Sequence, residues 1–171
     1  AARFDGIKLA PKDLRVSSAT LKAARKQVSP AFLKVLQDCS EGIRGFALAE
    51  KKALTKDWKI RRGSIVVGQS IHPVDSVGVY IPGGRFPYPS TVLMTVIPAL
   101  VAGVKRVVIA TPPKNMTPEV LAAASFVGCE TVYRMGGAGA IAALAYGTKT
   151  VAPVDFIVGP GKAFVTEARR H

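Results

Sequence analysis

The chain has 171 residues, of which 49% are apolar, so it is long enough and apolar enough to bury a hydrophobic core. No apolar run approaches the roughly 18 residues that a membrane-spanning helix needs, which predicts no association with a membrane. The 24 lysine and arginine residues outnumber the 11 aspartate and glutamate residues, and the formal net charge is +13.

The positive charge is concentrated near the N-terminus. Residues 1–62 carry a net charge of +9, whereas residues 63–171 carry +4. A basic segment can bind nucleic acid or another anionic partner. No aromatic residues interleave with these charges, and no zinc-finger or basic-zipper spacing is present, which argues against nucleic-acid binding. We interpret the charges as a solvated surface or a face covered by a partner subunit, and keep a catalytically empty anion- or nucleic-acid-binding module as an alternative function.

Residues 1–56 are predicted to form a helical segment that packs on a later sheet. We expect residues 1–15 to be an irregular lead-in. A first helix is predicted over about 17–28, and a second over about 29–54, where apolar residues recur at helical spacing. Two extended runs then flank Gly63, and we interpret residues 57–76 as a hairpin or an edge strand that leads into Val77.

From Val77 onward, short apolar strands alternate with helices. Ser90 is expected to cap the first of these helices, and Gly103 to end it. Thr117 and Pro118 are expected to open the next one. The predicted strands are 77–81, 107–110, 131–135 and 155–158, and the predicted helices are 91–103, 117–126, 138–146 and 162–171, the last without a stop signal, as in a piece of a longer chain.

This alternation predicts a Rossmann-like, doubly wound α/β fold for residues 57–171, with a mainly parallel sheet and flanking helices. In such sheets, ligands bind beyond the carboxyl ends of the strands. Tyr80 ends one predicted strand beside Pro82, where its ring would either stack on a ligand or belong to the core. We therefore searched the turns at the strand ends for binding motifs.

The turn after the third predicted strand contains Gly137-x-Gly139-x-x-Ala142, which is similar to a dinucleotide fingerprint. The fingerprint is incomplete, because a ribose-binding acid should end the next strand, whereas Asp155 precedes it. The alternative is a helix that packs closely on the sheet through small residues.

The turn after the fourth predicted strand, residues 159–162, also opens a helix. Lys162 would hold an anion or a cofactor amide there. This is not a Walker loop, because Ala163 follows the lysine where serine or threonine is needed. The alternative is a tight turn with an ordinary surface lysine.

Catalytic residues are scarce in the sequence. His72 and His171 are the two histidines, and no histidine, cysteine or acidic cluster has metal-ligand spacing. Neither a serine nucleophile motif nor an acid–base pair can be nominated. Cys39 and Cys129 have no pairing pattern, which favours a reduced, cytoplasmic protein. We predict no catalytic and no metal-binding residue in this chain.

A long series of motifs, in order, closely resembles histidinol dehydrogenase, with weaker similarity reaching back to residues 4–5. This resemblance implies a homodimeric, zinc-dependent and NAD-linked enzyme that oxidises L-histidinol through the aldehyde to L-histidine, in histidine biosynthesis. The matching runs are residues 77–84, 88–94, 97–99, 102–107, 111–113, 136–138, 140–148, 154–155, 159–161 and 164–170.

The family's site residues can be carried over position by position. The cofactor tyrosine of the family matches Tyr80. Two family positions differ here: Gly139 stands where the family has a glutamine, and Lys162 where it has an asparagine. Each change removes a polar contact of roughly 1–3 kcal/mol, which leaves the use of NAD and the substrate as open questions. The cofactor-binding candidates are Tyr80, Pro82, Gly136, Gly137, Gly139, Pro160, Gly161 and Lys162.

The resemblance also implies that the family's catalytic and metal-binding residues lie outside this chain. Its zinc ligands and its catalytic glutamate–histidine pair match positions beyond His171, so this chain is expected to be inactive by itself. An alternative within the family is a paralogue that oxidises another small alcohol, with Lys162 pairing with an anionic group of the substrate.

Overall fold

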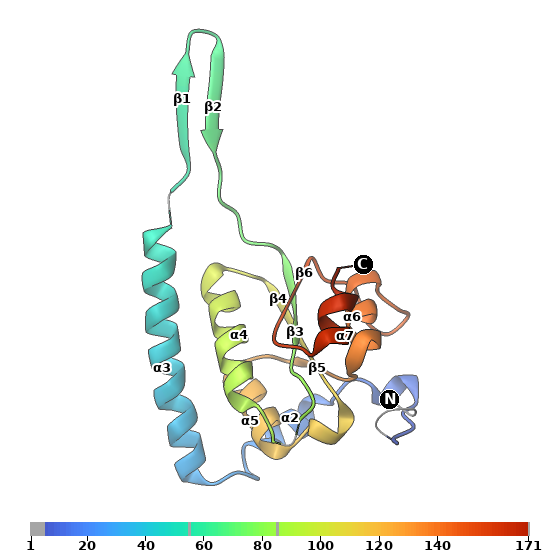
Figure 1. Ribbon diagram of the computed structural model, residues 1–171. Coiled ribbons are helices and arrows are strands. Elements are labelled where there is room, and N and C mark those ends of the chain that lie inside the picture. The colour runs from blue at the N-terminus through green and yellow to red at the C-terminus, as the bar shows by residue number, and fades with distance from the viewer. Residues whose placement is uncertain (1–5, 55, 85, 171) are drawn as a thin grey trace.

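The computed structural model describes residues 6–54, 56–84 and 86–170. Its centre is a four-stranded parallel sheet made of β3 (Ser76–Tyr80), β4 (Arg106–Thr111), β5 (Thr131–Arg134) and β6 (Phe156–Val158), in the order β5-β4-β3-β6 (Figure 1). All five residues of β3 are buried, because this strand is paired on both sides and covered on both faces.

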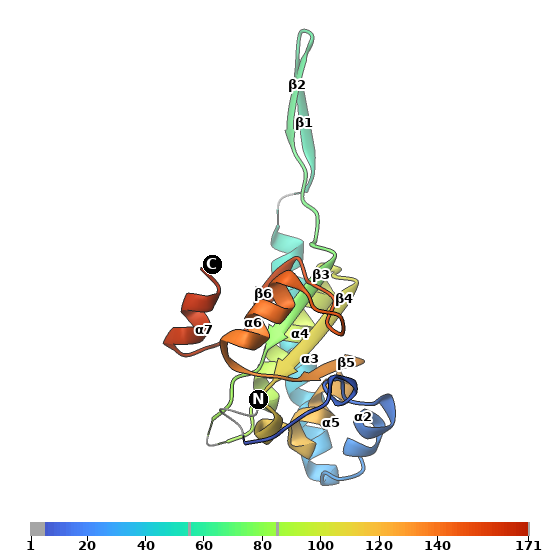
Figure 2. The same cartoon turned by 90° about the vertical axis from the view of Figure 1, so that its right-hand side faces the viewer.

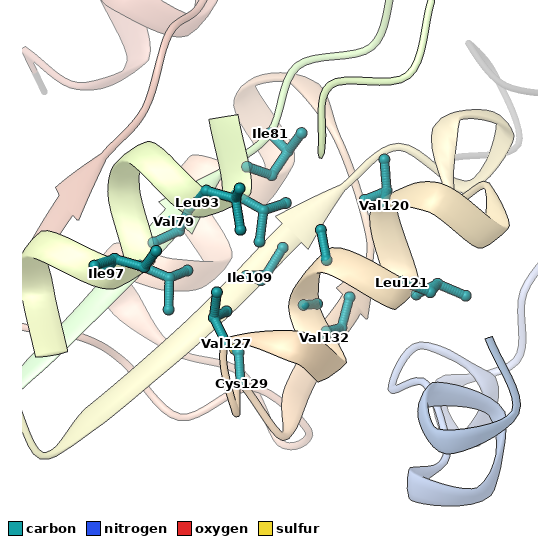
Figure 3. Close-up of a cluster of buried hydrophobic side chains, with 14 of the residues drawn as sticks. Val79, Ile81, Leu93, Ile97, Ile109, Val120, Leu121, Val127, Cys129 and Val132 are labelled. Carbon is teal, nitrogen blue, oxygen red and sulfur yellow. The ribbon is translucent and has the colours of Figure 1, made fainter. Parts of the chain in front are cut away.

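Helices connect the strands and cover both faces of the sheet. They are α4 (Pro89–Ala102), α5 (Pro118–Phe126), α6 (Gly137–Tyr146) and α7 (Ala163–Ala168), with the short 3-10 helix η2 (Pro113–Asn115) after β4. One core cluster joins Val79, Ile109 and Val132 of the sheet to α4 and α5 (Figure 3). The neighbouring positions, such as Val108 and Ala110, belong to a second cluster with α6 and α7. Neighbouring strand residues thus pack against helices on opposite faces of the sheet, which confirms the predicted doubly wound α/β fold.

The N-terminal helices form an outer layer. They are the 3-10 turn η1 (Pro11–Asp13), α2 (Ser18–Ala24) and α3 (Pro30–Ala53). Helix α2 packs mainly on α5, and α3 on α4, so both reach the sheet largely through other helices. The hydroxyls of Ser17 and Ser29 cap α2 and α3, at the positions where the sequence predicts these helices to begin.

The prediction of an irregular lead-in was partly wrong. The Val16 amide donates to the Val132 carbonyl at 2.8 Å, and the Arg134 amide donates to the Leu14 carbonyl at 2.7 Å. This short antiparallel pairing covers part of the outer edge of β5, which would otherwise expose unpaired backbone groups.

Helices α2, α4 and α7 each have one end that differs from the prediction, and one predicted capping bond is absent. Helix α2 ends at Ala24 and not at about residue 28. Helix α4 begins at Pro89, whose fixed φ suits a first helical turn, so Ser90 lies inside the helix and does not cap it. Thr117 occupies the N-cap position of α5, but its hydroxyl makes no capping bond. Helix α7 ends at Ala168, because the Arg169 and Arg170 amides tighten the last turn with bonds to residues three positions earlier, and His171 lies outside the described residues.

The hairpin of β1 (Trp58–Arg62) and β2 (Ile65–Gln69) is confirmed, with Gly63 at φ +61° in its turn. The alternative of an edge strand is wrong, because the hairpin stands clear of the four-stranded sheet (Figures 1 and 2). None of the helices in the described part of the chain is long and apolar enough to cross a membrane.

Asp155, which precedes the edge strand β6, ties this strand to the central strand β3 at their amino ends. Its Oδ2 accepts hydrogen bonds from the Ser76 hydroxyl at 2.7 Å and from the Ser76 amide at 2.8 Å. These bonds hold the pKa of the Asp155 carboxyl below its ordinary value of 3.8. Asp155 therefore has a structural role at the end of the sheet opposite to the glycine turns.

Replacing this carboxylate, as in Asp155→Asn, should destabilise the chain at neutral pH, because the amide accepts weaker hydrogen bonds than the anion. A lowered folded-state pKa contributes stability that is present above the unfolded pKa and is lost as the pH falls through the folded one. Urea unfolding of both proteins from pH 7 downward should therefore show a difference that starts to shrink as the pH falls below about 4 and is lost once the pH falls below the folded-state pKa. A difference that is constant with pH would contradict the role of the charge.

Candidate functional site

The candidate residues gather at the carboxyl ends of the strands. Strand β3 lies between β4 and β6, so the chain leaves it in one direction toward β4 and returns on its other side as β6. A reversal of this kind creates the crevice where open α/β sheets bind their ligands. Tyr80 ends β3, and residues 159–162 follow β6 at the same crevice.

Tyr80 is the residue that joins these turns. Its side chain is only 3% exposed, and its hydroxyl accepts a hydrogen bond from the Gly137 amide at 3.0 Å. Strand β3 is thereby attached to the first residue of α6. Of the two interpretations of Tyr80, a core residue with a locally satisfied hydroxyl describes this structure, and a contact with the cofactor stays a prediction.

The start of α6 is built from glycines for different reasons. A Cβ on Gly136 would meet the Pro112 ring, and Gly137 has φ +65°, a conformation that favours glycine. Gly139 has neither constraint, because nothing lies within 4 Å of where its Cβ would be, and it is exposed. Close packing on the sheet therefore does not explain Gly139. No side chain caps this helix.

The turn after β6 is held against Tyr80. Gly159 has φ +119°, and a Cβ there would overlap the Tyr80 carbonyl oxygen. Pro160, Gly161 and Lys162 follow it and are exposed. The backbone carbonyl of Lys162 accepts the amides of Val165 and Thr166, whereas its side chain makes no capping bond although it occupies the N-cap of α7.

Sequence reasoning missed Asn115, which supports the turn after β3. This side chain is 7% exposed, and its Nδ2 donates to the Gly84 carbonyl at 3.1 Å. A Cβ on Gly83 would come within 2.9 Å of the Asn115 Oδ1. Helix η2 therefore holds the glycine turn that follows Pro82. An asparagine shortly after a Pro-Pro pair was the available signal, but its contact across 31 residues was not readable from spacing.

Catalytic groups are scarce in the described part of the chain. In the described ranges, no group of three histidine, cysteine, aspartate or glutamate residues is placed to hold a metal ion. Burial raises the pKa of the Cys129 thiol to about 11, so Cys129 is neutral at physiological pH and is not an activated nucleophile. The arrangement offers open backbone at helix starts, which suits binding more than bond-breaking chemistry.

A sequence model of the histidinol dehydrogenase family matches residues 1–171. The chain belongs to this family. The histidinol dehydrogenase of Gloeobacter violaceus is 47% identical over 98% of the chain, and that of Listeria innocua is 44% identical over 99%. The crystal structure of the histidinol dehydrogenase from Elizabethkingia anophelis superimposes on 99% of the chain with a TM-score of 0.87 and 35% identity.

The chain spans about two fifths of the length of these family members: 38% of the Gloeobacter protein, and 39% of both the Listeria protein and the Elizabethkingia chain. The fold and the order of the glycine turns are thus those of a histidinol dehydrogenase over this part.

The glycine turns can be tested by a matched pair of substitutions. Gly159→Ala should destabilise the chain by about 2–4 kcal/mol, because its methyl group meets the Tyr80 carbonyl and its φ is unfavourable. Gly139→Ala should stabilise it by about 0.5–1 kcal/mol, because alanine is the better helix former and space is available. Urea unfolding measures both, and similar effects for the two variants would refute this distinction.

The hydrogen bond to Gly137 predicts a cost for Tyr80→Phe of about 1–2 kcal/mol in unfolding free energy, because the amide loses its partner. Tyr133→Phe is the matched control, since Tyr133 is also buried but donates only a long bond of 3.4 Å to the Thr150 carbonyl. Its cost should be smaller. Equal costs in urea unfolding would show that the Tyr80 hydroxyl has no special role.

Proposed function

We propose that this chain is the nucleotide-binding part of an NAD-dependent alcohol dehydrogenase that oxidises L-histidinol to L-histidine through the aldehyde. The observation that carries the proposal is the match of residues 1–171 to the family, together with open helix starts at the strand ends. Proposed with it, on the family resemblance, are a cytoplasmic location and a homodimer.

The described residues fit a dinucleotide. Helix α6 begins without a side-chain cap, so its N-terminal end can face an anionic pyrophosphate. Gly139 leaves open space there, and residues 160–162 are exposed on the other side of Tyr80. When bound, NAD would accept the hydride that leaves the alcohol. The chain itself would bind and orient the dinucleotide.

Zinc does not fit the described residues in the same way, because they include no suitable ligand cluster. We therefore assign no step of the reaction through zinc to this chain. The metal site of the proposed enzyme would be made by the part of the family's length that the chain does not span.

Positions 139 and 162 test the cofactor proposal. Gly139→Gln places an amide at the third position of α6, and Lys162→Asn places an amide at the N-cap of α7. Both are expected to tighten NAD binding, each by a factor of about 5 to 100, because each restores one polar contact. Isothermal titration with NAD measures this in the chain itself. No binding by the parent chain or either variant at millimolar NAD would overturn the cofactor proposal.

The effect of the two amides on NAD affinity must be separated from their effect on helix stability. Gly139→Gln and Lys162→Asn should also stabilise their helices by about 0.5–1 kcal/mol, since glutamine reaches back to the start of α6 and asparagine is a better N-cap than lysine. Gly139→Ala and Lys162→Ala provide controls without an amide. Tighter NAD binding in these alanine variants would show that helix stability, and not the amide, is responsible.

The activity requires a full-length protein. We suggest a hybrid in which residues 1–171 replace the matching segment of the Gloeobacter violaceus relative. NADH should form from histidinol in the presence of zinc, and none should form from the 171-residue chain alone. A folded hybrid that binds NAD but leaves histidinol unchanged would contradict the proposed substrate.

A second candidate rests on Lys162, whose exposed ammonium group lies beside the crevice. It would pair with a sulfonate or carboxylate on a small alcohol. The same hybrid distinguishes the two candidates. A preference for histidinol over anionic diols would exclude the second one.

A further inference from the structure

The hairpin of β1 and β2 has two chemically different faces. Side chains alternate along a strand, and directly paired residues share a face. One face carries Trp58, Ile60, Ile65 and Val67, because Ile60 pairs with Val67 and the other two lie two residues away along their strands. Arg62, which pairs with Ile65, and Gln69, which pairs with Trp58, lie at the two ends of this same face. The opposite face carries Lys59, Arg61 and Val66.

The first of these, which we call the apolar face, is open to solvent. Every residue of both strands is exposed, with 42% for Trp58, 58% for Ile60, 65% for Ile65 and 55% for Val67. Both views show the hairpin projecting beyond the helices and the sheet (Figures 1 and 2). An isolated two-stranded hairpin is marginally stable in water and needs a further strand or layer against its apolar face.

The base of the hairpin is held in place by Asp57. One carboxylate oxygen accepts the Ile71 amide at 2.8 Å, and the other accepts the Ser70 hydroxyl at 2.9 Å. These bonds join the segment before β1 to the segment after β2. The two strands of the projecting arm are therefore tied together at their base.

An extended groove begins beside this base. A hollow of about 740 Å³ lies between α3, α4 and the hairpin base, where Leu54, Ile71 and Val101 contribute apolar lining. A second hollow of about 380 Å³ follows along α3 and α4, and Glu50 and Pro98 line both. Its lining also includes Phe46 and Met94, exposed by 68% and 64%. The exposed apolar surface thus extends from the hairpin base along α3 and α4.

We propose that the apolar face of the hairpin and this groove are the surface on which the complementary part of a histidinol dehydrogenase polypeptide docks. That part is the roughly three fifths of the relatives' length that the chain does not span. A polypeptide of that size must pack on the matched part somewhere, and these apolar regions lie away from the candidate cofactor crevice.

A second copy of the 171-residue chain is the weaker candidate occupant. Each copy carries a formal charge of +13, so two copies repel each other. Residues 58–69 themselves contain three basic residues and no acidic one. A complementary partner should present apolar side chains to one face of the hairpin and carboxylates around it.

The hybrid with the Gloeobacter relative tests this docking through hydrogen–deuterium exchange of β1 and β2. The amides should exchange at least about tenfold more slowly in the hybrid than in the 171-residue chain, because a docked hairpin opens less often. The amides of β3 serve as the folding reference in both proteins. Equal exchange of the hairpin in the two proteins would overturn the proposal, and this readout does not depend on the proposed activity.

Two neighbouring valines provide the matched variants. Val67→Asp places a carboxylate on the apolar face, whereas Val66→Asp places it on the opposite face at a similar exposure of 48%. In the hybrid, Val67→Asp should abolish the protection of β1 and β2, and Val66→Asp should retain most of it. Equal effects of the two variants, with β3 still protected, would refute the assignment of the face.

A second copy would reveal itself in the 171-residue chain alone. Trp58 is the only tryptophan, so its fluorescence reports directly on the apolar face. We expect the emission of a solvent-exposed indole that does not change with protein concentration. A shift to shorter wavelength with rising concentration, with protection of β1 and β2, would assign the surface to self-association and overturn the proposed occupant.

Discussion

The contact of Tyr80 with both neighbouring turns is the constraint on which the site depends. Its hydroxyl holds the Gly137 amide, while its carbonyl leaves no room for any side chain at position 159. One residue at the end of the central strand therefore sets the positions of two helix starts. A buried tyrosine can do this because its ring fills the core while its polar end reaches a backbone group. The crevice is thus formed by β3 before any ligand contributes.

The order of strands and helices was predictable because several signals agreed. Residues 77–81 and 107–110 are short, β-branched and bounded by turn residues, which leaves few alternatives to buried parallel strands. Glycine at 103 and proline at 118 marked helix ends through backbone conformation alone. The crevice followed from this order, since the carboxyl ends of parallel strands meet at one edge of the sheet.

Long-range contacts were not predictable from spacing. The pairing of Val16 with Val132, the bond from Asn115 to Gly84, and the link between Asp155 and Ser76 each join residues far apart in sequence. The exposure of the hairpin was also hidden, because an alternating apolar pattern normally indicates a covered face. That pattern is present in β1, where Trp58 and Ile60 alternate with basic residues, and the described chain supplies nothing to cover it.

Positions 139 and 162 show how packing separates structural from functional constraints. Gly136, Gly137 and Gly159 are fixed by a neighbouring ring, a positive φ or a carbonyl oxygen, and the resemblance keeps all three. Gly139 and Lys162 are exposed, and on the resemblance they are the two candidate positions that differ from the family pattern. Gly139 has open space around it, and the Lys162 side chain makes no capping bond, so the proposal that these two positions contact what binds in the crevice requires no repacking of the fold. A change in ligand contacts can therefore occur there without disturbing the Tyr80 contacts that shape the site.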